Sequence, residues 1–188
     1  MRSLIRSCVQ VLAFEVLISA LGVSQQEPQL ARLTIALAKK EYFLGETVFV
    51  TYRLTNISSS LLCLPPPSVD CYSISGELAA TATPPKGVVG PKSSGGCAAD
   101  RWMEGDAGND IDQHWIKLGP LQFYEITAES HYIGLIAPGR WTVGGGYVPI
   151  REDTLSLYRD ALKERGCSTV PELHSETVAI TAKGKLVK

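Results

Sequence analysis

A short acidic cluster contains the side chains of this sequence that are best suited to chemistry. Asp106, Asn109, Asp110 and Asp112 fall close together, with Gly108 among them. Carboxylate and amide oxygens on a flexible loop that contains glycine are the ligands that Ca²⁺ prefers. The spacing differs from an EF-hand loop, in which a glycine is central and a glutamate closes the set. The cluster therefore predicts either a calcium-stabilised loop or a solvated acidic surface.

A second candidate for recognition is Trp102, which stands beside Arg101 in a stretch rich in Gly, Pro, Ser and Lys. An aromatic side chain on a loop often serves binding, since its large face can pack on a protein or a sugar. Trp115 and Trp141 fall in expected strands and are therefore predicted to lie in the core. We expect residues 101–112 to form a binding loop for a protein or polysaccharide partner.

Catalysis and resident cofactors are not favoured by the remaining polar residues. His114, His131 and His174 are spread over three segments without the close spacing of a metal site. The chain has no Gly-x-Ser-x-Gly nucleophile motif. We therefore expect a protein without enzymatic activity, cofactor or bound transition metal. The formal net charge of −1 also disfavours nucleic acid as a partner.

The first 24 residues have the layout of a secretory signal peptide. Arg2 and Arg6 precede an apolar run that ends near Gly22, and the run is too short to span a membrane. A buried N-terminal helix is the alternative. We expect residues 25–188 to form a single exported domain without a stable membrane anchor, secreted or periplasmic in location.

Four cysteines remain after that segment, and an even number in an exported chain predicts two disulfides. Three connectivities are possible. We favour Cys63–Cys71, which flank a run of prolines, together with Cys97–Cys167, which would fix a long loop at residues 84–108 to a later part of the chain. A zinc site is the alternative, although the chain lacks a Cys-x-x-Cys pair.

Most of the remaining sequence predicts strands. Residues 48–55 alternate strictly, and the turn before them is at Gly45-Glu46. One face carries Val48, Val50, Tyr52 and Leu54, and the other carries Phe49, Thr51, Arg53 and Thr55. Further strands are predicted at 33–38, 60–64, 70–82, 114–118, 123–128, 131–136, 140–148 and 176–183, with 131–136 and 140–148 as a hairpin. Residues 144–146, three glycines, predict a bulge or a close approach of another segment.

One helix is predicted, at residues 153–165. Asp153 is placed to accept hydrogen bonds from the first turn, and Gly166 follows at the usual stop position. Leu155, Tyr158 and Leu162 share one face. Asn56-Ile57-Ser58 is a formal glycosylation sequon in a turn, relevant only to a eukaryotic secretory pathway.

The segment with Tyr42, Gly45, Glu46 and Val48, followed by the alternating strand, resembles the opening hairpin of secreted bacterial immunoglobulin-like (Ig-like) domains. It is also similar to the intracellular-proteinase-inhibitor family. The resemblance implies an all-β fold, an antiparallel Ig-like β-sandwich, here with one inserted short helix and a long disulfide-pinned loop. It implies no catalytic residue.

Taken together, the residues predict a non-enzymatic binding module. We expect its binding surfaces at residues 84–112 and 151–171, which would meet if Cys97 paired with Cys167. Two alternatives remain open: a protease inhibitor that presents one of these loops, and a calcium-stabilised carbohydrate-binding domain.

Overall fold

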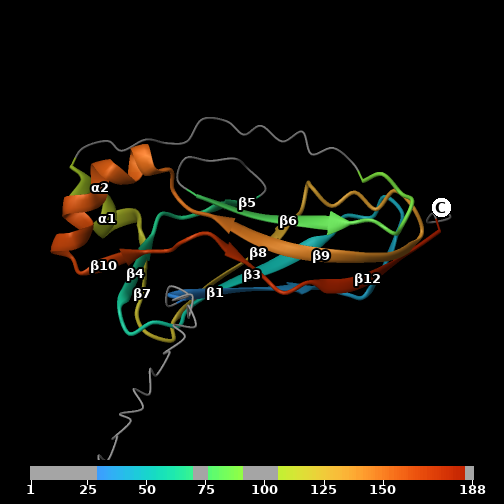
Figure 1. Cartoon of the computed structure of the whole chain (residues 1–188), viewed down its shortest axis with the longest axis horizontal. Helices are drawn as coiled ribbons and strands as arrows, with labels where there is room; N and C mark the ends of the chain where they lie inside the picture. The colour runs from blue at the N-terminus through green and yellow to red at the C-terminus, as the bar shows by residue number, and fades with distance from the viewer. Residues whose placement is uncertain (1–28, 70–75, 91–105, 185–188) are drawn as a thin grey trace, which may run out of the picture.

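The computed structural model describes residues 29–69, 76–90 and 106–184. The described residues are mostly strand with two short helices, so the all-β class is confirmed. Figure 1 shows an elongated molecule in which long strands occupy most of the length and both helices lie at one end. The predicted signal peptide lies outside the described residues.

The first sheet contains β1 (Ala31–Leu37), β3 (Phe49–Asn56) and β8 (Phe123–Glu129), in the order β1-β3-β8. Both pairings are antiparallel. In β3 the alternation has the predicted result, because Val50, Tyr52 and Leu54 are buried while Phe49 and Arg53 are exposed.

The second sheet has the order β2-β12-β9-β6-β5, and β11 also pairs with β9. Its central ladders, β6–β9 and β9–β12, are antiparallel. The strands are β2 (Glu41–Phe43), β5 (Ser68–Val69), β6 (Glu77–Thr83), β9 (Gly139–Val148), β11 (Leu173–His174) and β12 (Val178–Lys183).

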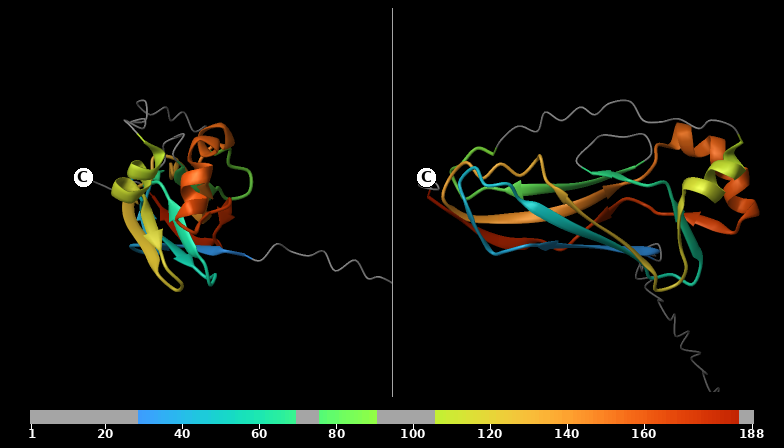
Figure 2. Two further views of the ribbon diagram at one scale, coloured as in Figure 1. Left: turned by 90° about the vertical axis from the view of Figure 1, so that its left-hand side faces the viewer. Right: turned by 180° about the vertical axis from the view of Figure 1, so that it is seen from behind.

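The two sheets pack face to face, as the front and rear views show (Figures 1 and 2). Their inner faces share one core, to which β3 contributes Tyr52 and Leu54 and β9 contributes Trp141 and Tyr147. Trp141 is therefore a core residue, as predicted. Burial of these alternating apolar side chains is what stabilises the layered arrangement.

Of the three glycines at 144–146, Gly145 is the one that meets the first sheet. Pairing of β6 with β9 continues through them without a bulge, so the predicted close approach is confirmed and the bulge is not. A Cβ atom on Gly145 would lie 2.4 Å from Cγ2 of Ile35 on β1. Only glycine lets the two layers meet at this distance.

A third, smaller sheet joins the sandwich to the helices. It has the order β10-β4-β7, formed by β10 (Cys167–Thr169), β4 (Leu61–Leu64) and β7 (Ile116–Leu118). Beyond it lie α1 (Ala107–His114) and α2 (Glu152–Glu164). Figure 2 shows both helices beside the ends of these strands.

The structure corrects three expectations about the elements. The sheets are not wholly antiparallel, since β2–β12, β5–β6 and β4–β10 are parallel pairs. Residues 131–136 form no strand, so the predicted hairpin is wrong. Instead Ile133 and Leu135 enter the core from an irregular segment whose Leu135 carbonyl accepts the Gly45 amide at 3.2 Å. The described residues contain two helices rather than one.

Candidate functional site

The helical end of the molecule is the candidate site, defined here as α1, α2 and the strands β4 and β10 beneath them. It has its own small core, which is separate from the core between the sheets. That core consists of the buried side chains of Cys63, Ile111, Trp115, Ile150, Tyr158 and Leu162. Trp115 and Tyr158 join the two helices, with ring centroids 4.9 Å apart. Trp115 is thus a core residue as predicted, although it packs between helices.

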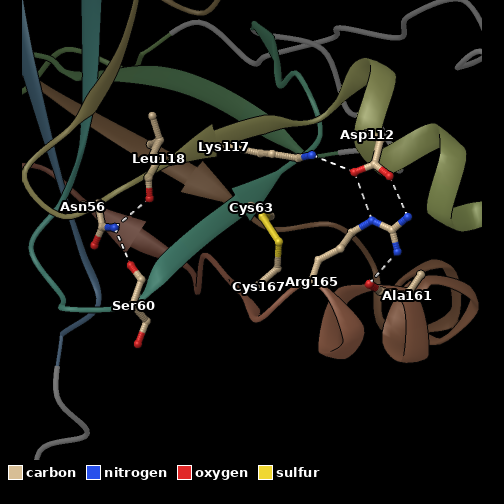
Figure 3. The surroundings of a disulfide bond; sticks show 9 residues. All are labelled: Asn56, Ser60, Cys63, Asp112, Lys117, Leu118, Ala161, Arg165 and Cys167. Atoms are coloured by element: carbon tan, nitrogen blue, oxygen red, sulfur yellow. Dashed lines mark hydrogen bonds and ion pairs between the residues drawn. A yellow bond between two sulfur atoms is a disulfide. The ribbon is translucent and has the colours of Figure 1, made fainter.

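A disulfide between Cys63 and Cys167 ties this small core to the sheets. Cys63 is on β4 and Cys167 on β10, which run parallel with Leu61 opposite Cys167 and Cys63 opposite Thr169. Figure 3 shows the bond crossing between the two strands, beside Arg165 at the end of α2. The bond contradicts both favoured pairings, Cys63–Cys71 and Cys97–Cys167. Cys71 and Cys97 themselves lie outside the described residues.

The acidic cluster belongs to α1 and not to a flexible loop. Asp106 caps the helix, with its side chain accepting the amide of Asn109 at 3.3 Å. Asp110 and Asp112 follow within the helix and project into contacts with α2. The prediction of a flexible loop over these residues is wrong, because tertiary contacts stabilise a helix here.

Asp112 is held by two cations. The guanidinium of Arg165 donates to both of its carboxylate oxygens, at 3.0 and 2.7 Å, and Lys117 Nζ donates at 2.8 Å (Figure 3). The same guanidinium also donates to the carbonyl of Ala161, at 3.1 Å. Hydrogen bonds from Arg165, and then from Lys117, lower the pKa of Asp112 far below its ordinary value. This carboxylate therefore joins α1 to the end of α2.

Asp110 makes a second connection between the helices. Its carboxylate accepts from the Tyr158 hydroxyl at 2.9 Å and from the Trp115 indole at 3.2 Å. It also lies 2.9 Å from Nδ1 of His114. Burial, together with the bond to Asp110, raises the pKa of Tyr158 above its ordinary value. The structural role of Tyr158, Arg165 and Lys117 was missed from the sequence, which offers no local spacing that links them to residues 106–112.

These contacts leave the acidic cluster poorly suited to calcium. The carboxylates of Asp110 and Asp112 are directed at donors from α2 and β7 and not at a common point. Across residues 29–69, 76–90 and 106–184, no three His, Cys, Asp or Glu side chains are grouped so as to hold a metal ion. The arrangement instead provides mechanical fixation of one helix on the other.

The other predicted site residues have mixed outcomes. Arg101 and Trp102 lie outside the described residues. His114, His131 and His174 are exposed and far apart in the fold, each beside a carboxylate of its own segment. The start of the one predicted helix shifts slightly, since Arg151 and not Asp153 is the N-cap of α2. Gly166, with φ +63°, follows the end of α2 as predicted.

Asn56, the first residue of the sequon, is fully buried. Its Nδ2 donates to the carbonyls of Ser60 and Leu118, both at 2.8 Å (Figure 3). Its Oδ1 accepts from the amide and hydroxyl of Ser58. The side chain therefore organises the turn between β3 and β4, and the folded protein does not offer its nitrogen for modification.

The two predicted binding surfaces were expected to meet only if Cys97 paired with Cys167, and their described parts are in contact without that bond. Residues 106–112 contact the 151–171 segment through Asp110 with Tyr158 and Asp112 with Arg165. The contact between the two segments depends on the packing of α1 against α2 beside the Cys63–Cys167 bond, and not on a bond to Cys97.

Comparison with known proteins assigns no family to this chain: no family model matches the sequence, and no curated protein matches it. Among the described residues, none of the helices has the length and apolar character that crossing a membrane requires. The disulfide indicates an oxidising compartment.

Proposed function

We propose that this protein is an exported β-sandwich of the Ig-like kind whose helical end binds another macromolecule. It acts by contact and not by catalysis. The observation that carries the proposal is the fixation of α1 on α2 and of both on the sheets. Asp112 with Arg165, Asp110 with Tyr158 and the disulfide hold one small surface in a single geometry.

Rigidity of this kind favours binding, since a surface that is already ordered loses little conformational entropy when a partner docks. The outer side of α2 offers suitable groups. Leu157 is 60% exposed, and the exposed charges of Glu152, Asp153 and Arg159 lie on the same helix. Asp153 precedes Leu157 by one turn on the same face of α2, and an exposed apolar side chain beside a charge is a common element of a small protein-binding surface.

Site-specific photo-crosslinking in the cells that make this protein tests the proposal. A photoreactive residue placed at Leu157 should yield a discrete covalent adduct with one partner. The matched control is the same residue at Phe43, which is 42% exposed on β2 at the far end of the molecule. Adducts from neither position, or the same adducts from both, would contradict binding through the helical end.

A further inference from the structure

The outer edge of β8 is a second candidate surface, because the backbone N–H and C=O groups on that edge point away from β3. In the described structure β8 is the last strand of its sheet and is hydrogen-bonded only to β3. The amide of Ser130 donates to the Val48 carbonyl, and the amide of Asn56 donates to the Gln122 carbonyl. Ser130 and Gln122 are both even-numbered. In the β3–β8 register, therefore, the even-numbered residues of β8 are the ones whose backbone groups bond to β3.

Residues alternate in an antiparallel ladder between those bonded to the neighbour and those facing away from it. The N–H and C=O groups that point away from β3 therefore belong to Phe123, Glu125, Thr127 and Glu129. The side chains of these four residues are all exposed on the outer face of the sheet. Tyr124, Ile126 and Ala128, on the inner face, are only half-buried, whereas the neighbouring β3 side chains are buried completely.

Natural edge strands are usually protected by proline, lysine, a bulge or very short length. β8 has seven residues and contains none of these features. The charge of Glu125 is neutralised by Arg53 at 2.6 Å, and Thr127 bonds to Thr51 at 2.7 Å. This edge is therefore a competent template for one more strand.

We propose that the strand added to this edge is β8 of a second copy of this chain, which would join the two three-stranded sheets into one. A two-fold axis through Ile126 places Phe123 opposite Glu129 and Glu125 opposite Thr127. All four outward-facing residues then find a hydrogen-bonding partner in the other copy.

The positions of Glu125 and Glu129 favour the register centred on Ile126 over its neighbouring registers. A shift of the axis to Thr127 would place Glu125 opposite Glu129, and a shift to Glu125 would place that residue opposite itself. Like charges directly opposite one another destabilise a strand pair. In the register centred on Ile126, Glu129 faces Phe123, over whose ring the Arg53 guanidinium stacks at 4.4 Å. The sheet already contains the same combination, since Phe49 of β3 lies opposite Glu129.

A cysteine scan of the disulfide-bonded protein tests the geometry. Ile126→Cys places two thiols on the axis in a non-hydrogen-bonded pair, where Cα atoms are about 4.5 Å apart and a disulfide can form. Thr127→Cys is the matched control, because its Cα atoms would be about 8 Å apart, beyond the reach of a disulfide. We expect a covalent dimer from Ile126→Cys and little from Thr127→Cys.

Light scattering over a concentration series provides the second readout. Thr127→Pro removes one outward N–H from the edge and no bond to β3, while Thr127→Val loses the same hydroxyl and keeps the N–H. We expect Thr127→Pro to weaken the dimer about tenfold relative to Thr127→Val, since two intermolecular hydrogen bonds are lost per dimer. A protein that stays monomeric at every concentration, or equal crosslinking of both cysteine variants, would overturn the proposal.

Discussion

At the scale of single residues, buried polar groups determine how the ends of the sandwich are built. Asn56 is fully buried, and each of its hydrogen-bonding atoms has a partner in the turn between β3 and β4 or at the end of β7. A buried group of this kind adds little net energy when satisfied but costs much when its partners are left alone. The contribution of the Asn56 side chain to stability is therefore measured by removing it.

Asn56→Ala should lower the free energy of unfolding by about 2–4 kcal/mol, because the carbonyls of Ser60 and Leu118 lose their donor in a buried place. Urea denaturation followed by fluorescence measures this change. Asn109→Ala is the control, since the exposed Asn109 side chain accepts from Gln113 Nε2, and its bond to the Asp106 cap comes from the backbone amide, which the substitution keeps. An equal effect of both substitutions would show that burial of Asn56 has no special role.

Asp112 predicts a specific dependence of stability on pH. Hydrogen bonds from Arg165 and Lys117 lower its pKa in the folded protein, so folding favours the ionised form. Its contribution is therefore fully present above the unfolded-state pKa of 3.8 and is lost as the pH falls below that value. The difference in stability between the parent and Asp112→Asn should be largest at neutral pH and should shrink below about pH 4.

Thermal unfolding between pH 2 and 7 measures that difference. Glu125→Gln is a useful control, because Glu125 also pairs with an arginine, but on the open face of the sheet. A gap between parent and Asp112→Asn that stays constant down to pH 2 would contradict the assigned ion pairs.

At the scale of elements, the success of sequence analysis followed the strength of local periodicity. β3 alternates between buried and more exposed residues along its whole length, and Val50, Tyr52 and Leu54 mark the buried face in the sequence, so its two faces could be predicted from the sequence alone. α1 buries the side chain of Ile111, with Ala107 partly buried against the same core and Trp115 at the end of the helix, and its other side chains are polar. It is helical because Asp110, Asp112 and Asp106 meet partners supplied by other segments or by its own first turn, and no short-range pattern encodes those contacts.

The packing of the two sheets depends on the absence of a side chain at Gly145. Gly145→Ala should destabilise the protein by about 1–3 kcal/mol, since its Cβ would overlap Ile35 and force the layers apart. Gly144→Ala is a matched control on the same strand, where the nearest atom to a new Cβ is Thr177 Cγ2 at 3.5 Å. Guanidinium denaturation of both variants measures their free energies of unfolding, and Gly145→Ala should be the less stable of the two.

Substitution of Ile35 provides the complementary measurement. Ile35→Ala removes the atom that the new Cβ would meet, so the double variant Ile35→Ala/Gly145→Ala should be more stable than the sum of the two single changes predicts. Strict additivity would show that the two residues do not meet across the layers.

At the scale of the whole molecule, the disulfide shows the limit of reasoning from spacing. The cysteine count predicted two disulfides, and one is present among the described residues, but pairing depends on which strands lie side by side. Cys63 and Cys167 are 104 residues apart and meet because β4 and β10 pair in parallel. Neither strand is longer than four residues, so neither gives a strong sequence signal. Of the three connectivities, only the one that pairs Cys71 with Cys97 is compatible with this bond.

The same bond lies in the smaller of two cores of unequal size, which predicts how the molecule opens. Among the described residues, the core of the helical end has six buried side chains, whereas the core between the two sheets is several times larger. In the loop-entropy model a bond that closes about 100 residues stabilises a protein by roughly 4–5 kcal/mol. Cys63→Ala/Cys167→Ala should therefore lower global stability by about that amount and should weaken the attachment of α1 and α2 more than that of β3 and β9.

Hydrogen exchange resolved by residue tests this order of opening. Amides of α1 and α2 should lose protection in the double variant, while amides of β9 keep most of theirs, because the Trp141 core does not include the bond. Reduction of the parent protein should reproduce the loss of protection in α1 and α2. Equal loss of protection in α2 and β9 would instead mean that both cores open together as one cooperative unit, with Asp110 and Asp112 sufficient to keep the helices attached.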